Sequence, residues 1–296
     1  MFPLSASHYA ELVGIKDPAQ RQDLANVMEE LSDFTVLLSR HIVIRLETDA
    51  VLTQTIGPGR RLVEPLAIIG SGAGWAFGNR LDLRFKSPEL GDVTERVRQG
   101  WHGGPDQFDR TKASVHRALE RKLLAGPKDD EIEELERDGW DPQAFERIVE
   151  ERARQEREQS LRLDAEPRWR RGRLRDLVSA REWMVDLSDG VNEALENRGV
   201  SLEDLNWSRD DARAFVGAMP STDVAVTLKT AAHKNAEKTW TTNDVHDIDA
   251  LALATPYCDV VVTEAYAHHI LHVTGTPGRT GTLVLRTLAN LEGYLC

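Results

Sequence analysis

The chain has 296 residues, a formal net charge of −12 at pH 7 and a pI of about 5.3. This charge excludes a uniformly basic nucleic-acid-binding coat, but not a local basic strip or binding through bridging metal ions. Two cysteines, Cys258 and Cys296, are too few for a disulfide framework or a cysteine-rich zinc site. No apolar run reaches the roughly 18–20 residues that span a bilayer. Because the N-terminus also lacks a basic, apolar leader, we expect a cytoplasmic protein with no membrane partner.

The first predicted segment, residues 1–103, mixes short apolar runs with helical patterns. Helices are predicted around Tyr9, after a Ser5 or Ser7 cap, and over 18–31, where apolar residues follow the 3.6-residue period. The runs at 36–38 and 43–46 are strand candidates or buried turns. A further apolar run leads into a glycine-rich loop.

The second segment, residues 104–215, is predicted to be helical and rich in charge, with prolines at helix starts. The third segment, residues 216–296, returns to an α/β pattern. Its predicted elements are a buried run over 224–228, a helix over 242–254, a strand over 257–263, a helix over 265–272 and a strand over 282–288. The simplest architecture is one α/β domain made from both ends of the chain, with the middle inserted as a helical cap.

Acidic residues gather around the predicted helix and strand of the third segment. Asp244 and Asp247 are three residues apart near the helix start, where the helix dipole favours negative charge. Asp249 lies about 200° around the helix from Asp247 and is assigned to another face. Glu264 follows the strand, at the edge where ligands bind in α/β sheets, whereas Asp259 lies at the far end. An all-oxygen set of this kind suits Mg²⁺ or Mn²⁺, although helix caps and surface acids would give the same pattern.

The stretch from Trp240 to Glu264 resembles the third and fourth acidic motifs of the PIN-domain nucleases. It contains Trp240, Asn243-Asp244 and Asp247, then Pro256-Tyr257-Cys258-Asp259 and a strand that ends in Thr263-Glu264. Residues 4–12 resemble the second motif of the family, in which a serine-rich helix start precedes a glutamate. The resemblance implies a PIN-like three-layer sandwich around a mostly parallel sheet with a large helical insertion. It also implies a metal site made of Glu11, Asp244, Asp247 and Glu264, with Ser5 or Ser7 in support.

The resemblance implies a metal-dependent endoribonuclease. Carboxylates would hold Mg²⁺ or Mn²⁺, the metal would lower the pKa of a bound water, and hydrolysis of RNA would leave 5′-phosphate ends. A homodimer is one option for its assembly, and the sequence identifies no inhibitor protein. The first motif of the family, a strand that ends in Asp, does not precede Glu11. Either an upstream in-frame segment carries that Asp, or the chain is a non-catalytic relative that binds RNA or protein.

Three weaker patterns remain. The first is an arginine strip around Trp169, in which guanidinium groups suit phosphates and the indole suits a base, unless it is a solvated helix start. The second is the loop over 70–78, which lacks the spacing of a dinucleotide-binding loop and the lysine of a P-loop but leaves a nucleotide-binding regulator as a third alternative. The third is a histidine group that could bind metal or lie on a surface helix. The arginines of the strip are Arg168, Arg170, Arg171, Arg173 and Arg175, and the histidines are His268, His269 and His272.

Overall fold

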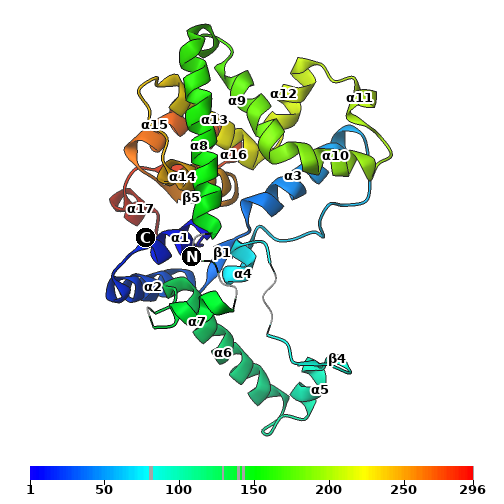
Figure 1. Cartoon of the computed structure of the whole chain (residues 1–296), viewed down its shortest axis with the longest axis vertical. Coiled ribbons are helices and arrows are strands. Elements are labelled where there is room, and N and C mark those ends of the chain that lie inside the picture. The colour runs from blue at the N-terminus through cyan, green and yellow to red at the C-terminus, as the bar shows by residue number, and fades with distance from the viewer. Residues whose placement is uncertain (80–82, 129, 139–140, 142–143, 296) are drawn as a thin grey trace. The chain divides into compact units, whose positions relative to one another are not determined.

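The computed structural model describes residues 1–79, 83–128, 130–138, 141 and 144–295 (Figure 1). Helices make up 67% of the structure, and the strands of the described part form only two-stranded sheets. The predicted PIN-like sandwich around a mostly parallel sheet is therefore wrong. A single parallel pair of three-residue strands is too small to form the middle layer of such a sandwich.

The chain forms two compact units, and each combines segments that are distant in sequence. The first unit contains residues 1–39 and 69–141, and the second contains residues 40–68 and 142–296. This division differs from the predicted segments, 1–103, 104–215 and 216–296, because the helical middle is shared between the two units.

The first unit is built on a short antiparallel pair, β1 (Thr35–Leu37) and β2 (Ile69–Ser71), in which Val36 faces Gly70. Leu4 adds a parallel bridge to Val36 on the other side. The helices of this unit are α1 (Ala6–Gly14), α2 (Pro18–Ser32), α4 (Ala73–Ala76), α5 (Thr94–Gln99), α6 (Pro105–Ala125) and α7 (Ile132–Arg137). Two short strands, β3 (Lys86–Ser87) and β4 (Gly91–Asp92), pair antiparallel. The core of the unit contains Leu4, Tyr9, Leu12, Phe34, Val36 and Leu124.

The second unit is helical apart from one parallel pair, β5 (Val260–Val262) and β6 (Leu283–Leu285). Its longer helices are α3 (Arg40–Thr55), α8 (Ala144–Ala165), α9 (Leu174–Glu182), α10 (Ser188–Glu196), α12 (Arg209–Gly217), α13 (Pro220–Lys234), α14 (Thr242–Tyr257), α15 (Ala265–Val273) and α17 (Leu288–Leu295). The shorter elements are η1 (Pro167–Arg170), η2 (Trp183–Leu187), α11 (Leu202–Leu205) and α16 (Thr276–Thr280).

Two runs with strand character are helical in the structure. Residues 224–228 lie inside α13, which begins with Pro220 at its first turn, and residues 43–46 lie inside α3. A run of five apolar residues fits a buried strand and a buried helix equally well. Helix α13 is buried on several sides, because Val226 packs into one apolar cluster while Val224 and Leu228 pack into another.

The acid run of the sequence folds as α14 followed by β5. Only Cys258 and Asp259 connect the two elements, so the strand returns toward the start of the helix. Helix α14 continues through Pro256 to Tyr257, beyond the predicted stop before the proline. In the described part of the chain, no helix combines the length and the apolar character needed to cross a membrane.

Candidate functional site

The predicted ligand Asp244 takes part in the cap of α14. Thr241 precedes the helix, and its backbone N–H and hydroxyl both donate to the Asp244 carboxylate, at 2.8 and 2.9 Å. Lys238 adds an ion pair to the same carboxylate at 2.5 Å. The Asp244 carboxylate is therefore already neutralised by a lysine and used by the helix start.

Asp244 and Glu264 act on the same tyrosine at one end of the second unit. Burial raises the pKa of Tyr266, Lys238 opposes this effect, and Asp244 and Glu264 each raise the pKa further. Glu264 is the N-cap residue of α15 and is exposed, and its side chain makes no cap hydrogen bond. Asp247 is exposed on α14. Asp244 and Glu264 thus both lie near Tyr266.

The fourth predicted ligand, Glu11, is exposed on α1 and belongs to the first unit. Ser5, its predicted support, is the buried N-cap of that helix. Both the backbone N–H and the hydroxyl of Ser5 bond to Nδ1 of His8 at 2.9 Å. Ser7, the other predicted support, is buried as well. Ser5 therefore serves the helix start.

The second unit also holds buried charges that were not predicted from the sequence. Nη1 of Arg40, the first residue of α3, lies 3.1 Å from Asp186 and 3.5 Å from Asp249. Nη2 of Arg40 lies 3.3 Å from Glu182, and Arg152 on α8 makes a two-pronged pair with Asp249. Three carboxylates thus converge on one guanidinium group, and we call these five residues the Arg40 cluster.

Glu182 connects the Arg40 cluster to Lys229 on α13, with which it also forms an ion pair. The Lys229 Nζ lies 3.0 Å from Glu156 and makes a shorter contact with Glu182. Glu156 also accepts from Arg181 at 2.6 Å and contacts Nε2 of His233 at 2.8 Å. The whole network contains equal numbers of carboxylates and permanent cations, so its formal charges cancel when His233 is neutral. The carboxylates are Glu156, Glu182, Asp186 and Asp249, and the cations are Arg40, Arg152, Arg181 and Lys229.

Pairing outweighs burial at two carboxylates of this network, Asp249 and Glu156. Burial alone would raise the pKa of Asp249, but Arg152 and Arg40 hold it below its usual range. Burial acts on Glu156 in the same way, but Lys229 and its other partners lower the pKa of this carboxyl to about 2. Both carboxylates are therefore ionised at neutral pH, which is tolerable in the interior only because the cations are present.

The π-helical turn η2 contains Asp186, one of the partly exposed residues of the Arg40 cluster. Glu182 ends α9 and Asp186 lies within η2, so the wide turn directs both carboxylates toward Arg40. Turns of this type are frequent at functional sites. The side chains of Asp186, Asp249 and Arg152 are 19, 21 and 22% exposed, whereas Glu182 is 1% exposed. Glu182 is therefore buried, whereas Asp186 and Asp249 are partly accessible to solvent. We call the part of the cluster formed by Asp186 and Asp249 its open end.

One signal in the sequence points to Asp249. It lies four residues after Val245 and three before Ala252, on the apolar stripe of α14. A charge within an apolar stripe needs a buried partner, because an unpaired buried charge is strongly unfavourable. Arg40 and Arg152 carry no comparable signal, since their partners are distant in sequence.

A further buried carboxylate, Glu47 on α3, joins three helices. It accepts from the backbone N–H and the hydroxyl of Ser221 on α13, at 2.8 and 2.7 Å, and from the Tyr257 hydroxyl on α14 at 2.5 Å. Burial raises the pKa of Glu47, although these donors and Arg40 oppose the shift. Glu47 thus fixes the start of α13 beside the Arg40 cluster.

The predicted arginine strip begins at a short helical turn, η1. Arg168 is 77% exposed and pairs with Glu166 at 2.6 Å. The Trp169 indole donates to the same carboxylate at 2.8 Å, and the Arg168 guanidinium lies 5.3 Å from the centre of the indole ring. This tryptophan also packs against the apolar core, so only part of its ring is accessible.

The remaining arginines of the strip have different surroundings. Arg170 pairs with Asp164 and donates to a backbone carbonyl of α13. Arg175 pairs with a carboxylate of α13 at 2.5 Å. Within the described ranges, Arg171 and Arg173 have no ion-pair partner. The strip is therefore only partly neutralised.

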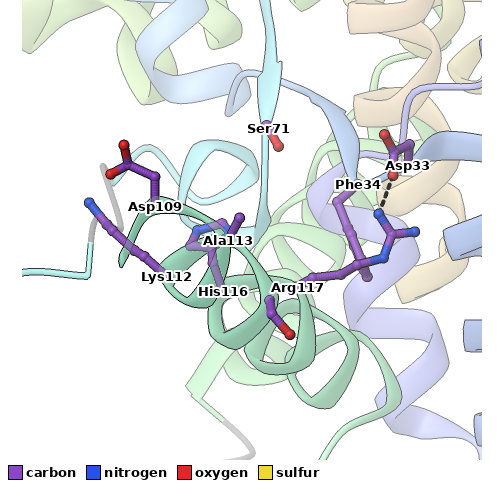
Figure 2. Close-up of a pocket in the computed structure, with 9 residues that line it drawn as sticks. Asp33, Phe34, Ser71, Asp109, Lys112, Ala113, His116 and Arg117 are labelled. Atoms are coloured by element: carbon purple, nitrogen blue, oxygen red, sulfur yellow. Dashed lines mark hydrogen bonds and ion pairs between the residues drawn. The ribbon is translucent and has the colours of Figure 1, made fainter. Parts of the chain in front are cut away.

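The first unit contains a groove of about 690 Å³, lined by the connection between α2 and β1, by β2 and by α6 (Figure 2). Arg117 pairs with Asp33 at 2.5 Å, and its guanidinium lies 5.5 Å from the centre of the Phe34 ring. Both Asp33 and Phe34 have positive φ angles, 46° and 54°. Figure 2 also shows Asp109 and Lys112 along α6, so the groove mixes both signs of charge and indicates no single class of ligand.

In the first unit, a carboxylate of α6 contacts the glycine-rich loop at the start of α4. A phosphate bound by this loop would lie at the same helix start. Glu120, which is 1% exposed, accepts the backbone N–H of Ala73 at 2.6 Å. Gly72 has a φ of +86°, and a Cβ atom there would lie 2.4 Å from Oε1 of Glu120. The loop therefore needs glycine for the close approach of Glu120.

No group of three or more His, Cys, Asp or Glu side chains in the described part of the chain is placed to hold a metal ion. The predicted histidine group lies on α15. His268 and His272 have ring centres 4.3 Å apart, and Nε2 of His272 donates to the Val284 carbonyl at 3.2 Å. His269 is exposed.

No family model, curated protein or solved structure matches this chain. The resemblance to the PIN-domain nucleases therefore stays a prediction from the sequence.

Proposed function

We propose that the chain is a metal-dependent hydrolase of RNA phosphodiester bonds whose reaction centre is the open end of the Arg40 cluster. One observation carries this choice of site. Two partly exposed carboxylates, Asp186 and Asp249, converge on a single cationic nitrogen. The reaction class is taken from the resemblance of residues 240–264 to nuclease motifs, and Asp249 lies within that stretch.

The open end of the cluster has the donor chemistry that Mg²⁺ or Mn²⁺ requires. Both ions prefer oxygen ligands, and Mg²⁺ is commonly bound by one or two carboxylates together with substrate phosphates. Asp186 and Asp249 would supply these carboxylates, so a protein cage of three ligands is not needed. When bound, the ion would lower the pKa of a water molecule and stabilise charge on the phosphate.

The guanidinium groups of the cluster suit the substrate. Arg152 and Arg40 remain protonated at neutral pH, since burial is outweighed by their carboxylate partners. Arg152, which is 22% exposed, can bind a phosphate oxygen pair in the way that it now binds Asp249, and Arg40, which pairs with the same aspartate, adds positive charge. A phosphate that takes over Arg152 would leave negative charge on Asp249. RNA and the divalent ion should therefore favour the binding of one another.

The test is cleavage of a single-stranded fluorescent RNA by the full chain in Mn²⁺. Asp249→Asn and Asp186→Asn remove one charge each with little change of shape. Each should lower the rate at least about 100-fold, because each removes a direct metal carboxylate. Asp259→Asn, at the start of β5, is the matched control and should cleave at the wild-type rate. Circular dichroism checks that each variant is folded.

The same assay separates the alternatives. If Asp244→Asn and Glu264→Gln abolish cleavage while Asp249→Asn does not, the reaction centre is the edge formed by α14 and β5, with the ligands predicted from the sequence. If wild type does not cleave RNA in Mg²⁺ or Mn²⁺, the hydrolase proposal is wrong and the non-catalytic RNA- or protein-binding alternative remains.

A further inference from the structure

Asp176 on α9 holds two arginines of α12. Arg213 donates to Asp176 from Nε at 2.6 Å and from Nη2 at 2.8 Å, in the side-on geometry of a two-pronged pair. Arg209 makes an ion pair with the same carboxylate. One negative charge is thus shared by two positive charges.

A second group also consists of two arginines and one aspartate, and it includes Arg175, the residue before Asp176. Asp223 on α13 accepts from Nη2 of Arg175 at 2.5 Å and from Nη2 of Arg279, on α16, at 2.8 Å. Arg175 also donates to the Thr227 hydroxyl at 2.9 Å. Because Arg175 and Asp176 are consecutive in the first turn of α9, the two groups flank the same helix start.

The arginines of both groups lie nearer the solvent than the aspartates. Their side chains are between 45 and 48% exposed, whereas Asp176 is 23% and Asp223 is 15% exposed. Each group has a net charge of +1, with its negative charge on the inner side. A molecule that approaches either group therefore meets its guanidinium groups before Asp176 or Asp223, although Asp210, the other partner of Arg213, is 86% exposed.

Neighbouring residues keep the surface positive. Arg173, the N-cap residue of α9, has no ion-pair partner among the residues that the structure describes. Burial lowers the pKa of Arg209, and Arg213 and Arg173 lower it further. Two acids of α12 oppose this charge. Asp210 pairs with Arg213 at 2.8 Å, and Asp211 belongs to the helix cap. Five arginines therefore face four aspartates, which leaves an excess of one positive charge.

We propose that these arginines form a binding surface for the sugar-phosphate backbone of single-stranded RNA, which rests on the proposed function for the identity of the substrate. The arginine surface consists of Arg173, Arg175, Arg209, Arg213 and Arg279. Guanidinium groups bind phosphates in the two-pronged geometry that Arg213 now makes with Asp176, so a phosphate competes with the aspartate for this guanidinium group. Two positive groups on either side of one helix start suit a chain with a repeated negative charge.

The test measures RNA binding by fluorescence anisotropy in EDTA, with a labelled oligouridylate and the full chain. EDTA prevents metal-dependent cleavage, so the affinity is measured separately from hydrolysis. Arg213→Gln and Arg279→Gln should each weaken binding about threefold to tenfold. Each should also lower the slope of log K against log salt by about 0.7–1, because fewer counterions are released.

Asp176→Asn has an expected effect of opposite sign. It removes the shared negative charge beside Arg209 and Arg213, so RNA should bind about threefold to tenfold more tightly and with a steeper salt dependence. The matched control is Glu151→Gln, which removes one of the two carboxylates that pair with the exposed Arg154 on α8 through the same change of charge. Glu151→Gln should leave RNA affinity unchanged.

Four results would overturn the arginine surface. These are an unchanged affinity in both arginine variants, weaker binding by Asp176→Asn, an equal gain in Asp176→Asn and Glu151→Gln, and competition by polyglutamate as strong as that by RNA. The last result would indicate an acidic protein partner. Arginine-dependent binding without any cleavage in Mn²⁺ would contradict the proposed hydrolase and leave the surface intact. Cleavage in Mn²⁺ together with an unchanged RNA affinity in both arginine variants would contradict the arginine surface and leave the hydrolase intact.

Discussion

Lys229 contacts two buried carboxylates of the charge network around Arg40. The Lys229→Met variant tests whether this network depends on a balance of charges. The lysine ammonium group contacts Glu156 and Glu182, whose side chains are 2 and 1% exposed. Methionine keeps the unbranched shape of the lysine chain, so the variant removes the charge with little change in packing. Four carboxylates would then face three permanent cations.

The expected loss of stability is large. Removing one partner of a buried ion pair costs about 3–5 kcal/mol, because the other partner stays buried without compensation. This corresponds to a decrease in Tm of roughly 6–20 °C for a unit of this size. The loss should be smaller at acidic pH. In the variant, Glu156 can take up a proton and restore neutrality, whereas in wild type burial raises the pKa of Glu156 but Lys229 and the other partners of this carboxyl lower it to about 2.

Urea-induced unfolding, followed by tryptophan fluorescence near pH 7 and about pH 4, measures both effects. Arg154→Met is the control on α8, because Arg154 is 51% exposed and solvent screens its ion pairs, so they should contribute little to stability. Lys229→Met combined with Glu182→Gln balances the charges again and should recover part of the loss. The reasoning is refuted if Lys229→Met destabilises no more than Arg154→Met, or if its effect is the same at both pH values.

Three further predictions concern acid, the glycine loop and metal. Wild type should lose stability as the pH falls from about 4.5 toward about 2, because the folded state lowers the pKa of Glu156 over this range, and full stability at pH 2 by circular dichroism would contradict it. Gly72→Ala should destabilise the first unit by about 1–3 kcal/mol in urea unfolding, and by more than Gly91→Ala, which also has positive φ but open space at its Cβ position. Mn²⁺ should raise the Tm of wild type and of Asp259→Asn but have a smaller effect on Asp249→Asn, and an identical response of the two variants would exclude metal at the Arg40 cluster.

The local sequence was sufficient for elements with strong start signals. Thr241 followed three residues later by Asp244 predicts a helix start, and α14 begins at Thr242 with both side chains in a reciprocal cap. The apolar run after it predicts a strand, and β5 lies within it. Both signals depend on residues within a few positions of one another, so they do not require knowledge of the rest of the fold.

Local sequence patterns were not sufficient to tell buried strands from buried helices. Residues 224–228 and 43–46 are apolar enough for strands, yet they lie in α13 and α3. Whether a short apolar run becomes a buried strand or a buried helix depends on what surrounds it. Here α13 is enclosed by two apolar clusters, which stabilise a helix that is apolar on several sides.

Local sequence patterns were enough for the composition limits and for the start of α14, and they set Asp249 on a different face from Asp247. The partners of Asp249 depend on the tertiary fold. Arg40, Arg152 and Asp186 come from three other elements, and no local pattern links them to Asp249. The physical reason is that helix caps and periodicity depend on neighbours along the chain, whereas a buried charge is stable only where packing brings an opposite charge to it.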